Sequence, residues 1–307
     1  MRLWKSTPVF GAVLLVSLLA QTGVAQGAQV SCGQVITADT TLDSDVGPCA
    51  GDGIIIGRDN VTLDLNGYAV LGAPPPGGLL ASTVGIKVDS HAQARVRNGT
   101  VAGFGTGVEL FQRQGSTLER LLVRDNQNFG IRVFSFDNVV RGNLVERNGD
   151  LGVVVFGGSG NTIEGNVIRS NGGTGFHLTR GGLNTRTGGT TVRANSITAN
   201  GDDGVSLGGL SSTASVLANV ISSNNGNGVA LGEFSFSHLV EGNRMVGNEG
   251  NGVLVVRTLG PWNGLHRILT NVALGNGLVD LVDEYPGCDA NTWLGNQFGT
   301  RSQGCIS

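Results

Sequence analysis

Apolar and polar residues alternate in short units along most of this chain. A four-residue unit, glycine-apolar-any-apolar, begins at residues 85, 107, 130, 152, 175, 204, 228 and 252. Alternation with a period of two over such short segments predicts β-strands whose side chains point alternately inward and outward. The spacing of 22 to 29 residues between units indicates a structural repeat.

A second unit lies between these strands, in which two asparagines flank four residues, as in GNLVERN at 142–148. Asparagine tolerates left-handed backbone angles, so we expect the chain to bend at these residues. Asparagine amides in equivalent positions also form hydrogen-bonded ladders. The repeated asparagines are Asn143, Asn166, Asn195, Asn219, Asn243 and Asn271, continued by Asn296, and then Asn148, Asn171, Asn200, Asn224, Asn248 and Asn276.

The repeat predicts an all-β fold, a right-handed single-stranded parallel β-helix (a solenoid) of about ten coils over residues 51–284. One coil cannot bury its apolar face, whereas stacked coils share a continuous core. Parallel crossovers favour the right hand, and ten coils at roughly 4.8 Å each give a rod of about 50 Å. The predicted inward stack is Ile131, Val153, Phe176, Val205, Val229 and Val253.

Four cysteines lie near the ends of the chain, in two pairs with a separation of 17 residues. Four cysteines allow three disulfide connectivities. The local one, Cys32–Cys49 with Cys288–Cys305, is favoured because the others would link opposite ends of a long rod. A four-cysteine zinc site is the alternative, but it lacks a C-x-x-C pair. We expect caps at 26–50 and 285–307 that cover the open sheet edges.

Residues 1–25 have the pattern of a cleaved signal peptide, with basic residues at the start and then an apolar segment too short to span a membrane. The protein is therefore expected outside the cytoplasm, secreted or periplasmic, without membrane insertion. The 52 glycines lack the three-residue period of collagen, and 39% hydrophobic residues exclude a disordered chain.

Without residues 1–25 the chain has 18 basic (20 less Arg2 and Lys5) and 23 acidic residues, a net charge of −5. No run of lysine or arginine provides the electrostatic footprint for nucleic acid. We therefore expect no nucleic-acid partner, and we expect a monomer.

The opening CGQVITADTTLDSDVGPCAGDGIIIGRDNVTLDLNGYAVLG and the ending DLVDEYPGCDANTWLGNQFGTRSQGC resemble the terminal segments of secreted bacterial proteins of the pectate-lyase-like (pectin-lyase-like) superfamily. This resemblance implies the parallel β-helix fold over residues 30–307. It implies no single activity, because the superfamily includes lyases, hydrolases, epimerases and proteins without a known reaction.

One outward row of the repeat has candidate chemistry in its first half. Its members are Lys87, Glu109, Arg132, Val154, His177, Ser206, Ala230 and Leu254, with Asp280 as a continuation. Cations in such a row would neutralise the carboxylate of an acidic sugar, and a basic side chain would remove the neighbouring proton. His177 or Arg132 would then act as the base, with Glu109 orienting it and Lys87 among the substrate-binding residues. The alternative is a solvated face whose charges pair along the stack.

Two insertions, 179–190 and 256–266, interrupt the repeat at the same edge. The first contains Arg180 and Arg186, which would bind substrate carboxylates, and the second contains Trp262, which would stack on a sugar ring. Packing of Trp262 against the rod is the alternative.

Other features favour structural roles. The rows Glu119, Arg141, Glu164, Arg193, Leu217, Glu241 and Arg124, Glu146, Arg169 alternate in charge, as ion pairs between coils require. Phe111, Phe134 and Phe156 are interpreted as packing, with a ligand platform as the alternative. Asp202-Asp203 resembles the aspartate pair of polygalacturonases, whose companion motifs have no match here, so an ordinary turn is favoured.

No cofactor is expected. The four histidines His91, His177, His238 and His266 are dispersed in the sequence, and no metal is assigned, although calcium bound by Asp150, Asp202 and Asp203 remains an alternative. The sequence thus predicts a protein that binds polysaccharide or another cell-surface glycan. The alternative is a polysaccharide lyase or hydrolase acting on an acidic glycan near His177.

Overall fold

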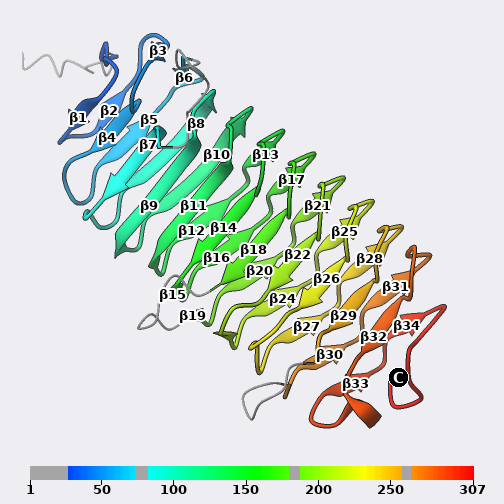
Figure 1. Ribbon diagram of the computed structural model, residues 1–307. Coiled ribbons are helices and arrows are strands. Elements are labelled where there is room, and N and C mark those ends of the chain that lie inside the picture. Colours follow the sequence, from blue (N-terminus) through cyan, green and yellow to red (C-terminus); the bar gives the residue numbers. More distant parts are fainter. Residues whose placement is uncertain (1–26, 74–81, 180–186, 258–263) are drawn as a thin grey trace, which may run out of the picture.

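The structure is a computed structural model that describes residues 27–73, 82–179, 187–257 and 264–307. These residues form a rod of stacked coils that runs without a break from β1 to β34 (Figure 1). Each coil adds one strand to each of three long flanks, and strands of successive coils pair in parallel. The predicted parallel β-helix is confirmed.

The first flank is a sheet of eleven strands, called the long sheet below, which confirms a solenoid of about ten coils. Its strands are β1 (Gln34–Ile36), β4 (Ile54–Ile56), β7 (Val84–Asp89), β9 (Thr106–Gln114), β11 (Phe129–Phe136), β14 (Val153–Phe156), β18 (Phe176–Thr179), β22 (Val205–Leu207), β26 (Val229–Leu231), β29 (Val253–Val255) and β32 (Leu281–Asp283).

The second and third flanks are joined by β8 (Arg95–Ala102) and β10 (Thr117–Arg124), which run through the corner between them. The second flank also contains β2 (Thr40–Thr41), β5 (Thr62–Asp64), β12 (Val139–Arg141), β16 (Thr162–Glu164), β20 (Thr191–Arg193), β24 (Ser215–Leu217), β27 (Leu239–Glu241), β30 (Arg267–Leu269) and β33 (Thr292–Leu294). The third contains β3 (Val46–Cys49), β6 (Ala69–Gly72), β13 (Leu144–Glu146), β17 (Val167–Arg169), β21 (Ser196–Thr198), β25 (Val220–Ser222), β28 (Arg244–Val246), β31 (Val272–Leu274) and β34 (Gln297–Phe298).

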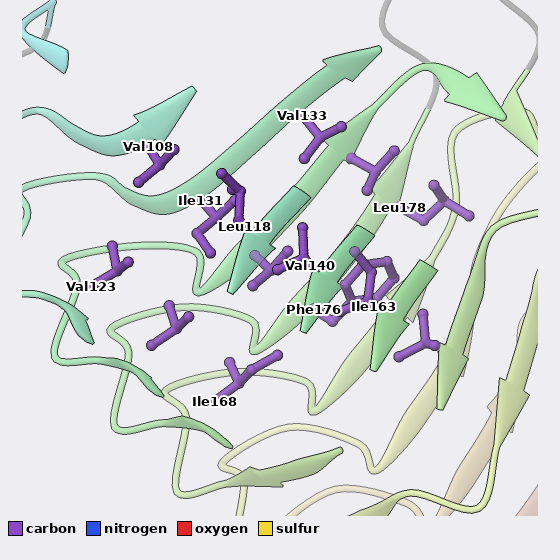
Figure 2. Close-up of a cluster of buried hydrophobic side chains, with 14 of the residues drawn as sticks. Val108, Leu118, Val123, Ile131, Val133, Val140, Ile163, Ile168, Phe176 and Leu178 are labelled. Atoms are coloured by element: carbon purple, nitrogen blue, oxygen red, sulfur yellow. The ribbon is translucent and has the colours of Figure 1, made fainter. Parts of the chain in front are cut away.

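The core fills the space between the three flanks. Figure 2 shows Val108, Ile131 and Phe176 from the long sheet pointing toward Leu118 and Ile163 of the second flank. The predicted inward stack of the long sheet, from Ile131 to Val253, is fully buried. Burial of one such aliphatic side chain contributes ~1.5–3 kcal/mol, so the repeated inward positions are the main source of stability.

Two asparagine ladders run along the rod beside this core. In each ladder the Nδ2 atom of one asparagine donates to the Oδ1 atom of the next, as in Asn195 to Asn219 at 2.9 Å and Asn219 to Asn243 at 2.9 Å. The ladder from Asn143 reaches Asn296, as predicted. The other begins at Asn126, one coil earlier than the repeat indicated.

The backbone bend does not lie at the asparagines themselves. The left-handed residue is the one immediately before each asparagine, for example Ala194 (φ 53°), Ala218 (φ 51°) and Ser223 (φ 56°). The ladder asparagines themselves have no positive φ, and their side chains turn into the rod to form the ladder. The prediction of a bend was correct, but its assignment to asparagine was wrong by one residue.

The glycines of the glycine-apolar-any-apolar units have a steric role. A Cβ atom on Gly152 would lie 2.6 Å from the carbonyl oxygen of Gly175 and 2.8 Å from Nδ2 of Asn171. Gly130 meets the same two neighbours one coil earlier, Gly152 and Asn148. Neither glycine has a positive φ, so the repeat requires glycine here for close approach of the coils rather than for a special backbone angle.

The predicted disulfides Cys32–Cys49 and Cys288–Cys305 are both present, and no free cysteine remains among the described residues. Cys288 ends the short 3₁₀ segment η1 (Pro286–Cys288). In the chain-entropy model each loop closure of this size contributes ~3 kcal/mol. The predicted signal peptide lies outside the described residues. No helix within the described ranges has the length and apolarity needed to cross a membrane.

Candidate functional site

The predicted outward row lies in register on the long sheet. Successive pairs join Lys87 to Glu109, Glu109 to Arg132 and Val154 to His177, and the row runs on through Ser206, Ala230 and Leu254. Its last member is Val282, not Asp280. Asp280 takes the place that glycine holds in the preceding coils, and it is buried beneath the C-terminal segment.

Arg132 and Glu109 form an ion pair on the outer face of β9 and β11. The Nη2 atom of Arg132 donates to Oε2 of Glu109, which is buried. The guanidinium also lies over two rings, 5.5 Å from the centroid of Phe129 and 5.4 Å from that of Phe134. A guanidinium held by a carboxylate and by two rings is fixed in place, so this geometry suits a positioned cation that binds an anionic group.

Three phenylalanines beside this pair form a continuous aromatic ladder along the long sheet. The rings of Phe111 and Phe134 are 5.6 Å apart, and those of Phe134 and Phe156 are 5.1 Å apart and stacked. Phe129 meets the Phe156 ring edge-on at 6.1 Å. All four rings are half-exposed and lie outside the buried core cluster. The rings pack on one another, as expected, but they do so on the surface of the rod.

His177 lies between two aspartates from the neighbouring coils. Burial lowers the pKa of the His177 imidazole, and the charges of Asp150 and Asp202 oppose that shift. Burial also raises the pKa of the Asp150 carboxyl, while His177 lowers it and Asp202 raises it. Asp150 precedes β14 and Asp202 precedes β22, so the three groups come from three successive coils and influence one another through their charges. Oδ2 of Asp202 accepts a hydrogen bond from Oγ1 of Thr174 at 3.2 Å.

Sequence reasoning did not group these aspartates with His177. The signal was available, because Asn-Gly-Asp occurs at 148–150 and again at 200–202, one coil on each side of the coil with His177. In the coil between them the equivalent residue is Gly173. A Cβ atom on Gly173 would lie 2.5 Å from Oδ1 of Asp150, so glycine leaves the room that this carboxylate occupies.

The candidate calcium ligands do not converge on one point. Oδ1 of Asp203 accepts hydrogen bonds from the backbone nitrogen (2.7 Å) and Nδ2 (2.8 Å) of Asn227. Over the described part of the chain, no three His, Cys, Asp or Glu side chains are arranged to hold a metal ion.

The insertions are described only at their flanks. Arg180, Arg186 and Trp262 lie outside the described residues. The first insertion returns at β19 (Thr187–Gly188), which pairs with β15 (Gly158–Ser159) and β23 (Ser211–Ser212). Gly264, after the second insertion, bridges to Phe236, which bridges to Ser212. Both insertions therefore return at the same edge of the rod.

Two other predictions concerned the charged rows and the four histidines. Several members of the charged rows pair between coils, with Arg141 to Glu119 at 2.6 Å and Arg169 to Glu146 at 2.7 Å, and these pairs stabilise the stack. Arg124 departs from the prediction, because it pairs with the adjacent Asp125 at 2.7 Å. The histidines are less dispersed than the sequence indicated, because the rings of His238 and His266 stack 5.3 Å apart in consecutive coils.

Comparison with known protein families identifies this architecture. The family model described as "right handed beta helix region" matches residues 40–188 and 180–260. No curated protein matches the chain.

Several solved structures share the fold. The periplasmic alginate epimerase AlgG is 14% identical, with a TM-score of 0.69 over 88% of this chain and 70% of the epimerase. The Dettilon tailspike protein (gp208) is 17% identical, with a TM-score of 0.64 over 88% of this chain and 58% of the tailspike. The A-module of the mannuronan C-5 epimerase AlgE6 from Azotobacter vinelandii is 17% identical, with a TM-score of 0.58 over 87% and 81%. At these identities the likeness shows the fold, including its right hand, and the family match covers most of the chain. The protein therefore belongs to the right-handed β-helix family.

Proposed function

We propose that this protein binds a polysaccharide along the outer face of the long sheet. The observation that carries the proposal is the half-exposed aromatic ladder of Phe111, Phe134 and Phe156, with the guanidinium of Arg132 held against it. Flat rings offer an apolar surface for the faces of sugar rings. The ladder repeats once per coil, so it suits a polymer better than a single small molecule.

Charged groups beside the ladder favour an acidic glycan. Arg132 is fixed by Glu109 and the phenylalanines, and Lys87 lies two coils away in the same row, 3.5 Å from Asp89. Both cations project from the long sheet, where they would meet sugar carboxylates. The names of two fold relatives, an alginate epimerase and a mannuronan epimerase, are consistent with an acidic polymer.

Replacement of Phe134 by alanine tests the ladder. Phe134 contacts both other rings and Arg132, so F134A is expected to weaken binding to polygalacturonate or alginate about tenfold, measured by affinity electrophoresis. The matched control is F234A, because Phe234 is 43% exposed but lies four coils further along than Phe134, after β26. Equal binding by wild type and F134A would contradict the proposal.

Export from the cytoplasm is part of the proposed function, because the polymer lies outside the cell. The two disulfides and the signal-like N-terminal pattern support it. Mass spectrometry of the protein recovered from its source is expected to show a mature N-terminus near residue 26. A chain that retains Met1 would count against export.

A second candidate function is acid–base catalysis at His177, favoured by its position between Asp150 and Asp202. A neutral imidazole near a bound acidic sugar would accept the proton beside the carboxylate, and the two aspartates would stabilise the resulting cation. In this scheme Arg132 binds the carboxylate and Glu109 orients it.

Incubation with polygalacturonate or alginate would test this second candidate. The ultraviolet absorbance of unsaturated product should rise with wild type and not with H177Q, while binding by H177Q stays intact. A wild-type protein that binds the polymer and forms no product would exclude the lyase.

A further inference from the structure

A depression of about 700 Å³ lies at one corner of the rod, at its N-terminal end. Residues from four successive coils line it: Asp39 follows β1, Arg58 and Asp59 follow β4, His91 follows β7, and Arg113 belongs to β9. None of these residues belongs to the repeat that builds the core, and the proposed aromatic ladder does not include them.

The carboxylates in this depression already have partners. Oδ1 of Asp39 accepts a hydrogen bond from the backbone nitrogen of Thr62 at 2.8 Å. Oδ1 of Asp59 accepts one from the backbone nitrogen of Ala92 at 2.8 Å and lies 3.2 Å from Nδ1 of His91. The hydrogen bond from Ala92, with His91 and Arg113 nearby, keeps the pKa of Asp59 below its ordinary value. These two aspartates therefore hold the corner together.

The two arginines of the depression, Arg58 and Arg113, differ from the arginines on the neighbouring flank. Arg58 and Arg113 are exposed, and neither forms an ion pair with a carboxylate in the described part of the chain. By contrast, Arg95, Arg97 and Arg120, on the neighbouring flank, all pair with acidic side chains. Each unpaired guanidinium offers five N–H donors in a planar fork that fits a carboxylate.

The depression adjoins the N-terminal end of the aromatic ladder. Asp89 pairs in register with Phe111, and the backbone nitrogen of Ser90 donates to the oxygen of Phe111 at 3.1 Å. His91 is two residues beyond Asp89, and Arg113 is two residues beyond Phe111 on the same strand. A glycan that lies on the ladder and extends toward the N-terminal end would bring its next sugar to the two arginines.

We propose that this corner, called the arginine pocket, binds the carboxylate of a terminal uronic acid residue, with Arg58 and Arg113 as its donors. This inference rests on the proposed glycan binding and adds to it a charged end-subsite that selects acidic over neutral chains. The group that the two arginines would recognise is a carboxylate on a sugar. A methyl-esterified chain is therefore the matched neutral ligand.

The test compares oligogalacturonate with its methyl ester by isothermal titration calorimetry, using the purified full-length protein. R58Q and R113Q should each weaken binding of the acidic ligand at least tenfold and leave binding of the ester unchanged. R113K, which keeps the charge but loses the fork, should weaken acidic binding to an intermediate degree. The control is R244Q on β28, because Arg244 is also exposed and without an ion pair among the described residues, but lies on the third flank.

The test distinguishes a failure of the arginine pocket from a failure of the aromatic ladder. If R58Q and R113Q bind the acidic ligand as wild type does, the arginine pocket is refuted, whatever F134A shows. If F134A binds both ligands normally while R113Q loses only the acidic one, the pocket stands and the aromatic ladder does not. A wild-type protein that binds neither ligand overturns both. Melting followed by circular dichroism should be unchanged in the arginine variants, because the substituted arginines are exposed.

Discussion

Replacement of Asn219 by alanine is expected to lower the free energy of unfolding by about 4 kcal/mol. The Asn219 side chain donates to the oxygen of Val192 (2.8 Å) and to Oδ1 of Asn243 (2.9 Å), and it accepts from the backbone nitrogen and Nδ2 of Asn195 (both 2.9 Å). Asn219 is buried, so alanine leaves all four partner groups without water or a replacement. An orphaned buried group costs ~1–3 kcal/mol, partly relieved by relaxation.

Urea unfolding of N219A and wild type measures this difference. N225A is the matched control, because Asn225 lies in the next corner of the same coil but is exposed and makes no side-chain hydrogen bond with the described residues. N225A should change stability by less than about 0.5 kcal/mol. A loss in N219A no larger than that of the control would show that the ladder does not stabilise the rod.

Acidification from pH 7 to about 4.5 is expected to destabilise the protein through His238 and His266. Both imidazoles are buried, and Nδ1 of each accepts a backbone hydrogen bond, from Ala214 at 3.1 Å and from His238 at 3.3 Å. Protonation would remove these acceptors and place two cations 5.3 Å apart. Burial lowers the pKa of His266 to about 4 and, with the charge of His266, lowers that of His238 well below its ordinary value.

The direction of this change in stability with pH follows from proton uptake. The folded pKa lies below the unfolded value of 6.5, so between pH 6.5 and about 4 the unfolded chain binds more protons. Stability is therefore complete above pH 6.5 and falls as the pH falls through this window. A shift from 6.5 to about 4 corresponds to about 3 kcal/mol for His266 alone.

The double variant H238N/H266N should remove this pH dependence. Asparagine fits the position, because Asn138 and Asn161 accept the equivalent backbone hydrogen bonds in earlier coils of the same corner. Urea midpoints at pH 7, 6, 5 and 4.5 would show a steep fall in wild type and a much shallower one in the variant, which keeps His177, whose pKa burial also lowers. The carboxylates are the same in both proteins, so their contribution cancels in the comparison. Parallel profiles would contradict the assignment.

The fold could be predicted because the sequence pattern that produces it is periodic. A residue such as Val153 can be assigned to the core once its equivalents, Ile131 and Phe176, recur at the same place in neighbouring coils. The ladder position of Asn219 follows in the same way. Periodicity does not resolve single-residue geometry, however. It did not show that Ala218, rather than Asn219, takes the left-handed angle, or that Gly152 is required for contact between coils.

The candidate sites were less predictable, since they depend on residues that depart from the repeat. His177 was recognised from its place in a row, but the influence of the Asp150 and Asp202 charges on it depends on corners, whose lengths vary between coils. The arginine pocket combines residues as far apart as Asp39 and Arg113, none of which follows a common pattern. His238 and His266 occupy the corner position that Asn138 and Asn161 hold in earlier coils, and only their stacking shows that they belong together.

The asparagine ladders also give the rod an electrical polarity. Every amide in the ladder from Asn126 points its N–H end toward the C-terminus, and the last, Asn276, donates at 2.9 Å to the carboxylate of Asp280. Burial acts to raise the pKa of Asp280, but the hydrogen bonds from Asn276, Gly299 and Thr300 outweigh it and keep the carboxyl ionised.

A shorter ladder runs the opposite way, from Asn251 through Asn227 to the carboxylate of Asp203. In both cases aligned dipoles end on a negative charge at their positive end, the same relation that favours an acidic residue at the start of an α-helix. Each of these two columns thus ends on a carboxylate that accepts a hydrogen bond from its last amide, one at the C-terminal end of the rod and one within it.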